Sequence, residues 1–143
     1  MNKDLKRAVA LLKNHRCALC KGETEMIFDE RGIAPALTIA ESGADLSGAA
    51  VADAVIGKAT AMLYALAGVT SAYARVLSRR AIPIFERFGI EYSYEELADC
   101  IINRSGDGAC PMEKAVELVD DPQEALAAVK QKLSELRQKA ENQ

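Results

Sequence analysis

The chain has 143 residues, of which 50% are hydrophobic and 27% are charged, and its net charge is -3 at pH 7. This composition is that of an ordinary globular protein and excludes an intrinsically disordered chain. No basic stripe is present, which argues against general binding to nucleic acid phosphates. The length predicts a single domain over residues 1–143.

Hydrophobic spacing and turn residues predict a mixed succession of helices and strands. In chain order these are a helix over 3–14, hairpin strands over 17–20 and 24–28, a helix over 35–41, a long helix over 47–67, a strand over 71–76, a helix over 79–88, a strand over 90–92, a helix over 111–119 and a C-terminal helix over about 123–141. Residues 95–102 suit either a helix or a strand. The order predicts an α/β fold, a three-layer α-β-α sandwich with a mixed sheet.

The stretch from Ser47 to Ala67 is the most apolar part of the chain. Its length raises the question of a membrane span, but Asp53 and Lys58 lie near its middle and alanine dominates it. Central charges are expensive in lipid, and alanine inserts weakly. We therefore expect a buried core helix that ends at Gly68 and no membrane association.

Four cysteines and a charged, leaderless N-terminus predict free thiols in a reducing cytoplasm. Cys17 and Cys20 have a C-x-x-C spacing, but in a strand they point to opposite faces and cannot share a metal. We expect both to be small buried residues. Cys100 is expected in the core.

Three separated stretches carry a resemblance when taken together: residues 31–35, residues 51–53 through 57–59, and residues 101–104 through 110–113. They resemble an uncharacterised bacterial family of the cytidine deaminase-like superfamily. The resemblance implies a cytidine deaminase-like fold. It also implies a homo-oligomer, because such domains commonly build their clefts at subunit contacts.

In zinc deaminases the corresponding places carry H-x-E and P-C-x-x-C. By this resemblance Asp53 stands where the general acid/base Glu would be, and Val51 takes the place of the histidine ligand. Cys110 lies near the first cysteine ligand, and Glu113 takes the place of the second. Since valine has no donor atom, we predict no zinc cofactor and no hydrolytic deamination.

Two charged residues interrupt the apolar stretch, Asp53 and Lys58. Each must reach solvent or find a partner. One interpretation is that they face a ligand cleft, and the other is that they extend to the helix edge or pair elsewhere.

The loop Asn103-Arg104-Ser105-Gly106-Asp107-Gly108 precedes a predicted helix start. Backbone N–H groups and Arg104 predict an anion site there. The alternative is an ordinary loop in which Asp107 caps the next helix. Cys110 follows it and is either a thiolate nucleophile, activated by the helix N-terminus and Arg104, or a residue packed under the loop.

Together these observations predict a protein that binds a small anionic or nucleotide-like ligand without hydrolytic deamination. The candidate catalytic residues are Asp53 and Cys110, and the candidate ligand-binding residues are Lys58, Asn103, Arg104, Ser105 and Glu113. The alternative is an enzyme, either a divergent deaminase-like hydrolase or a transferase that uses Cys110. A third interpretation is an interaction module without a ligand, suggested by the charged C-terminal helix.

Overall fold

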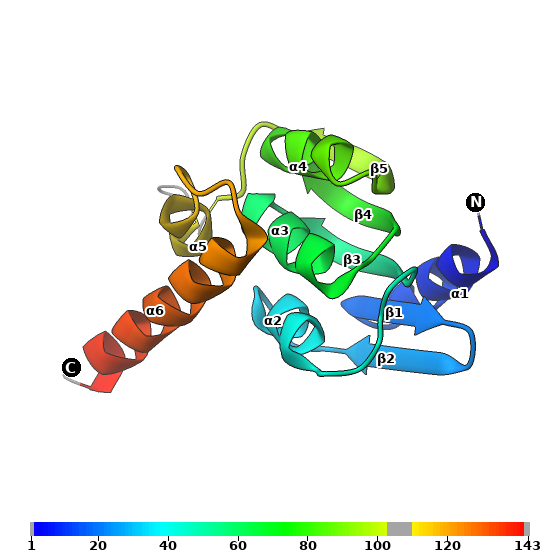
Figure 1. Cartoon of the computed structure of the whole chain (residues 1–143), viewed down its shortest axis with the longest axis horizontal. Coiled ribbons are helices and arrows are strands. Elements are labelled where there is room, and N and C mark those ends of the chain that lie inside the picture. Colours follow the sequence, from blue (N-terminus) through cyan, green and yellow to red (C-terminus); the bar gives the residue numbers. More distant parts are fainter. Residues whose placement is uncertain (1, 103–109, 142–143) are drawn as a thin grey trace.

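The computed structural model describes residues 2–102 and 110–141 (Figure 1). In chain order the elements are α1 (Lys3–Leu12), β1 (Cys17–Lys21), β2 (Thr24–Phe28), α2 (Ala34–Glu41), β3 (Ala50–Ile56), α3 (Lys58–Ala67), β4 (Ser71–Ser78), the 3-10 helix η1 (Arg79–Ala81), α4 (Ile82–Arg87), β5 (Glu91–Ala98), α5 (Pro111–Ala115) and α6 (Pro122–Glu141).

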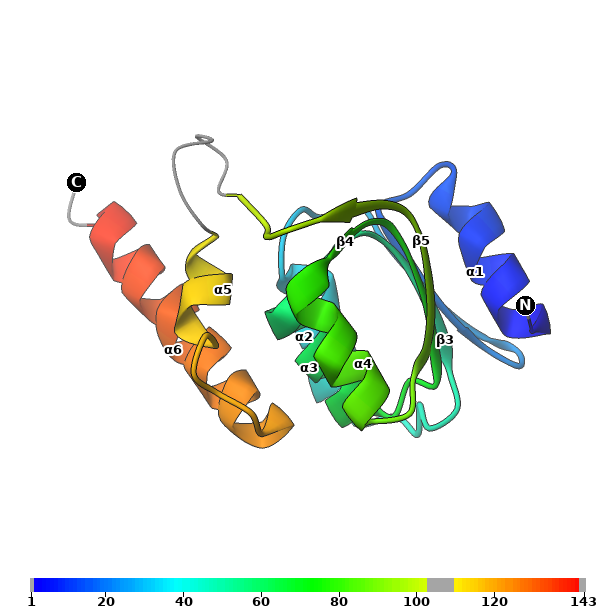
Figure 2. The same cartoon turned by 90° about the horizontal axis from the view of Figure 1, so that it is seen from above.

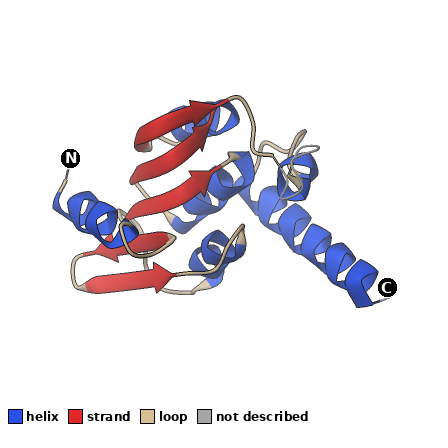
Figure 3. Cartoon of the chain, turned by 180° about the vertical axis from the view of Figure 1, so that it is seen from behind, coloured by secondary structure: helices blue, strands red, loops and turns tan. Residues whose placement is uncertain are grey.

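Five strands form one sheet in the order β2-β1-β3-β4-β5. The hairpin strand β1 is antiparallel to both β2 and β3, whereas β3, β4 and β5 are parallel to one another. Helices α3 and α4 make the crossovers that parallel strands require. They lie with α2 on one face of the sheet and α1 lies on the other (Figures 2 and 3). The predicted α/β fold, a mixed sheet between helical layers, is confirmed.

The predicted helix over residues 47–67 is wrong in its first half. Ala50–Ile56 form β3, the central strand, and α3 begins only at Lys58. A short apolar run buried on both faces shows no alternation, so periodicity cannot separate it from a buried helix. The glycine at position 57 interrupts the apolar run, and it was the sequence signal that separated the strand from the helix. Asp53 therefore lies in a strand and not in a helix.

Several boundaries also differ from the prediction. Residues 95–98 belong to β5, which is longer than the predicted strand, and α5 ends at Ala115 instead of Val119. Cys100 is half-buried, not part of the core. Gly68 does end α3, in the left-handed region with a φ of 92°. Ser78 caps η1, because its hydroxyl accepts from the N–H of Arg80.

The main core lies between the sheet and the layer of α2, α3 and α4, with residues 59–64 of α3 buried along their whole length. A smaller core lies between α1 and the other sheet face and contains Ala8, Leu12, Ala18, Cys20 and Ala52. Cys17 belongs to the main core, so the two C-x-x-C thiols are buried on opposite faces as predicted. No helix in the described part of the chain is long and apolar enough to cross a membrane.

Candidate functional site

The N-terminus of α3 is closed by a carboxylate from far along the chain. The Glu113 carboxylate, on α5, accepts the N–H of Lys58 at Oε1 (2.7 Å) and the N–H of Ala59 at Oε2 (3.0 Å). Glu113 is only 4% exposed. The first N–H groups of a helix have no partner within the helix, and its positive end favours an anion. This contact therefore satisfies α3 and joins it to α5.

Gly57 makes room for this contact. A Cβ at this position would lie 1.7 Å from Oε1 of Glu113 and 3.0 Å from a side-chain carbon of Ile101. The backbone of Gly57 is extended, with a φ of -103°, so its conformation does not require glycine. The requirement is the space that the carboxylate fills.

A pocket of about 290 Å³ opens beside Glu113. Its walls come from the first residue of α3, from η1 and α4, and from α5 and the segment that joins it to α6. The lining residues are Lys58, Arg80, Pro83, Ile84, Glu113, Glu117 and Asp120. The Arg87 side chain, on α4, donates a hydrogen bond to the Asp120 carbonyl (2.5 Å) and so connects the α5–α6 segment to α4.

The pocket is lined by two cationic side chains and three acidic ones. Lys58 is half-buried, and its ammonium group donates to the Glu117 carbonyl (3.1 Å). Arg80 is exposed, and no carboxylate lies within 4 Å of it among residues 2–102 and 110–141. Glu117 and Asp120 are both exposed. Since Glu113 is held by backbone N–H groups, these two carboxylates are the ones that face solvent.

A second polar cluster lies inside the main core, on the sheet face that α3 covers. The Tyr64 hydroxyl, on α3, donates to Oδ2 of Asp53, and the Cys17 sulfur lies 3.4 Å from the same hydroxyl. Cys17 and Asp53 are directly opposite each other on β1 and β3. Tyr64 and Cys17 are fully buried, and Asp53 is 9% exposed.

Burial controls the protonation of this cluster. It raises the pKa of Asp53 to about 6, although the Tyr64 hydroxyl and the N–H groups of Val55 and Ala54 act in the opposite direction. Burial also raises the pKa of Tyr64 and of the Cys17 thiol well above their ordinary values, and the Asp53 charge adds to both. Tyr64 and Cys17 therefore stay neutral at physiological pH.

The structure brings together only some of the residues that the sequence marked. Lys58 and Glu113 meet at the pocket, whereas Asp53 lies in the core and does not line it. Cys110 is half-buried at the N-cap of α5, and its N–H donates to the Ile101 carbonyl (3.0 Å). Asn103, Arg104 and Ser105 lie outside the described residues.

Arg80, Glu117, Asp120 and Tyr64 were not predicted. Arg80 follows the end of β4, as Lys58 follows the end of β3, and these strands are parallel. The carboxyl ends of parallel strands meet at one edge of a sheet, where open α/β sheets bind their ligands. That signal was available only once residues 50–56 were assigned to a strand.

The residues implied as zinc ligands do not fit a zinc ion. Val51 lies in β3 and has no donor atom. Both carboxylate oxygens of Glu113 accept backbone N–H groups, and a site that offers donors favours an anion over a cation. Within residues 2–102 and 110–141, no three His, Cys, Asp or Glu side chains gather as a metal site. The lack of zinc stays a prediction.

A family model described as a domain of unknown function (DUF1893) matches residues 7–133. The chain belongs to the DUF1893 family. The predicted membership of an uncharacterised family is thereby confirmed. The crystal structure of a DUF1893 family protein from Thermotoga maritima is similar, with a TM-score of 0.83, 27% identity and 92% of each chain covered.

A second crystal structure is more distantly similar to this DUF1893 chain. It is a diaminohydroxyphosphoribosylaminopyrimidine deaminase / 5-amino-6-(5-phosphoribosylamino)uracil reductase from Thermotoga maritima, with a TM-score of 0.43 and 17% identity over 64% of this chain and 35% of that one. This similarity is too weak to support any inference about chemistry. No curated protein matches the chain.

Proposed function

We propose that this protein binds a small anionic or nucleotide-like ligand in the pocket between Lys58 and Arg80, without hydrolytic deamination. The observation that carries the proposal is the convergence of these two cationic side chains, from different elements, on one pocket. A guanidinium group and an ammonium group are the usual partners of phosphate and carboxylate groups.

The position of the pocket supports the same function. Lys58 and Arg80 each lie two residues after the carboxyl ends of the parallel strands β3 and β4. Ligands of open α/β sheets bind in this region because loops and helix N-termini converge there on a rigid framework. Glu113 fixes the wall by joining α5 to α3.

The exposed acidic residues of the pocket limit the class of ligand. Glu117 and Asp120 accept hydrogen bonds and repel anions, so the ligand should carry amino or hydroxyl groups as well as its negative charge. The volume of about 290 Å³ is just below the range of roughly 300–1,000 Å³ that small-molecule pockets occupy. A sugar phosphate or a nucleoside monophosphate fits this description better than a dinucleotide.

Thermal unfolding at low ionic strength tests the proposal. The probes are inorganic phosphate, ribose 5-phosphate, adenosine and cytidine monophosphates, and the uncharged nucleosides. A phosphorylated compound at a hundred times its Kd should stabilise the chain by about 2.7 kcal/mol. Arg80→Ala and Lys58→Met should each abolish this stabilisation.

Arg79→Ala is the matched control. Arg79 is the neighbour of Arg80 on η1, but it pairs with Asp99 (2.9 Å) and does not line the pocket. If no compound stabilises the chain, or if Arg79→Ala weakens binding as much as Arg80→Ala, the proposal is wrong. Ammonia release and alkylation of Cys110, measured in the same samples, test the enzymatic alternative, and sedimentation tests the predicted homo-oligomer.

A further inference from the structure

Helix α6 is longer than the domain surface that it covers. It runs from Pro122 to Glu141, and its first half packs against α3 and α5, where Ala125 and Val129 are buried. Its second half extends away from the other elements (Figures 1 and 2). The residues from 134 to 141 are all exposed. The family match ends at residue 133, close to where the helix leaves the domain.

One apolar stripe continues along both halves of α6. It consists of Leu126, Val129, Leu133, Leu136 and Ala140, which follow one another in steps of three, four, three and four residues. This spacing is the heptad pattern by which one helix packs along another. Val129 is buried against the domain at one position of the stripe, whereas Leu136, at a later position, is 37% exposed. The stripe therefore continues beyond the surface that it covers.

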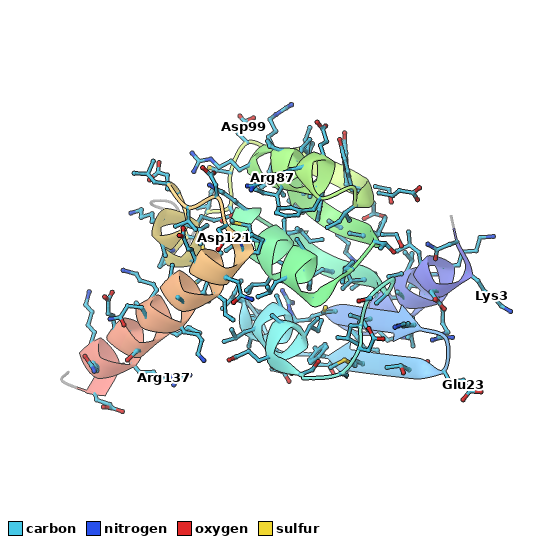
Figure 4. The ribbon with its side chains drawn as sticks, in the orientation of Figure 1. Lys3, Glu23, Arg87, Asp99, Asp121 and Arg137 are labelled. Atoms are coloured by element: carbon cyan, nitrogen blue, oxygen red, sulfur yellow. The ribbon has the colours of Figure 1, made fainter. Side chains whose placement is uncertain are left out.

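The positions that flank the stripe are basic. Lys130, Lys132, Arg137 and Lys139 occupy the positions next to the apolar ones, where charges meet a packed helix. Figure 4 shows Arg137 near the far end of α6. Glu135 lies 3.8 Å from Lys132 on the same helix, but an exposed pair of this kind contributes little.

One basic residue beside the stripe already has an acidic partner within the domain. Where α6 leaves the body, the Lys130 ammonium group pairs with the Glu41 carboxylate of α2 at 2.8 Å. An apolar contact from the stripe and a carboxylate beside it together hold this part of α6. The next heptad repeats the apolar and basic positions, and no such carboxylate from another element pairs with Arg137 or Lys139 in the described part of the chain.

We infer that the second half of α6 is a docking surface for an acidic amphipathic helix of another protein. Such a helix would place leucine-like side chains against Leu133, Leu136 and Ala140. Its Glu or Asp side chains would meet Arg137 and Lys139, as Glu41 meets Lys130. Charge complementarity at flanking positions determines which helices pair.

The same charges disfavour the other occupants. If a second copy of α6 packed on this stripe, in either orientation, basic flanks would face basic flanks. A membrane surface suits a broad apolar face with bulky residues. Here the exposed part of the stripe is narrow and ends in Ala140, which is typical of a helix–helix seam.

Nuclear magnetic resonance titration of the full chain tests this inference. The probe is a three-heptad peptide with Leu at the two apolar positions and Glu at both flanking positions, and the control peptide has Lys at those flanks. We expect shifts confined to residues 130–141 with the acidic peptide, even if the Kd is as weak as about 1 mM. The basic peptide should cause none.

Two variants separate the stripe from the general charge of the helix. Leu136→Lys places a charge on the stripe and should weaken binding about tenfold or more. Gln138→Lys adds the same charge to the opposite, polar side of α6 and should not weaken it. Absence of shifts with the acidic peptide, or equal binding by Leu136→Lys, would overturn the inference.

The remaining outcomes replace the occupant. A dimer of the chain alone that Leu136→Lys dissociates and Gln138→Lys does not would identify a second copy as the partner. Sedimentation with anionic vesicles that Leu136→Lys alone abolishes would identify a membrane surface. Either result would overturn the assignment to an acidic helix. None of these measurements depends on the pocket at Lys58.

Discussion

Helix α3 contacts two carboxylates, and they are buried in different ways. At its N-terminus Glu113 accepts two backbone N–H groups, at 2.7 and 3.0 Å, next to a pocket that contains Lys58 and Arg80. Further along the helix, Asp53 accepts the Tyr64 hydroxyl within the core. The first carboxylate has donors at the positive end of a helix, whereas the second has mainly a neutral hydroxyl in an apolar environment.

The contrast between Glu113 and Asp53 shows that a buried carboxylate need not belong to a ligand site. Burial outweighs the opposing hydrogen bonds and raises the pKa of Asp53 to about 6, yet this residue lines no part of the pocket and its partners are core residues. A perturbed pKa indicates a functional site when the group also lies in a cleft, and structural networks perturb pKa values as well. The open cluster at Glu113 therefore suits a ligand, and the closed cluster at Asp53 concerns stability. Three changes test this comparison.

Glu113→Ala should have the largest effect on stability. It removes two charge-assisted hydrogen bonds and leaves the N–H groups of Lys58 and Ala59 without an acceptor in a buried place. We expect a loss of about 3–5 kcal/mol in the free energy of unfolding, measured with urea. Glu117→Ala removes an exposed carboxylate four residues later, beyond the end of α5, and should stay within about 0.5 kcal/mol. If both changes lower the free energy of unfolding equally, Glu113 does not have the structural role described here.

Asp53→Asn should change the pH dependence of stability. Because the folded pKa of about 6 lies above the ordinary 3.8, the contribution of this group is complete below about pH 4 and is lost as the pH rises through 6. Asparagine cannot ionise. Between pH 4 and pH 7 the variant should therefore gain about 3 kcal/mol relative to the wild type, since each pKa unit is worth about 1.4 kcal/mol.

The control for this measurement is Asp45→Asn. Asp45 is exposed, and the N–H of Ser47 lowers its pKa, so the sign of its small pH-dependent effect should be reversed. Unfolding curves at several pH values measure both variants. A difference between Asp53→Asn and the wild type that does not vary with pH would show that the carboxylate is not held in the apolar environment described above.

Local signals predicted much of the fold. The hairpin of residues 17–28 and the end of α3 at Gly68 each follow from a few neighbouring residues, and both are present. Strand β3 was missed because residues 50–53 are buried on both faces and the strand is rich in alanine. Its assignment depends on β1 and β4 on either side, which are distant in the chain.

The candidate site was predicted only in part, for the same reason. Lys58 and Glu113 were both marked, but their contact joins two helices that lie 55 residues apart. Arg80 joins them because β3 and β4 are parallel neighbours, a relation that no local pattern reveals. Asp53 was marked for its charge in an apolar stretch, and the structure supplies Tyr64 as its partner.

The smallest effect is expected from Gly57→Ala, which tests the fit of the Glu113 carboxylate without removing it. The added Cβ would lie 1.7 Å from Oε1, so the side chain of Glu113 must shift, which lengthens and weakens its bonds to α3 without removing the carboxylate. In the Glu113→Ala background the same methyl meets only Ile101 closely, at 3.0 Å. Alanine at an N-cap costs below about 1 kcal/mol by itself.

The two substitutions should therefore be non-additive by about 2 kcal/mol in a double-mutant cycle measured by urea unfolding. Gly57→Ala is costly only while the carboxylate is in place, so the coupling reports the contact and not the helix propensity of alanine. If the costs of the two changes simply add, Glu113 does not occupy the N-terminus of α3 in solution. The contrast with Asp53 would then lose its basis, because neither carboxylate would be held by donors at the end of a helix.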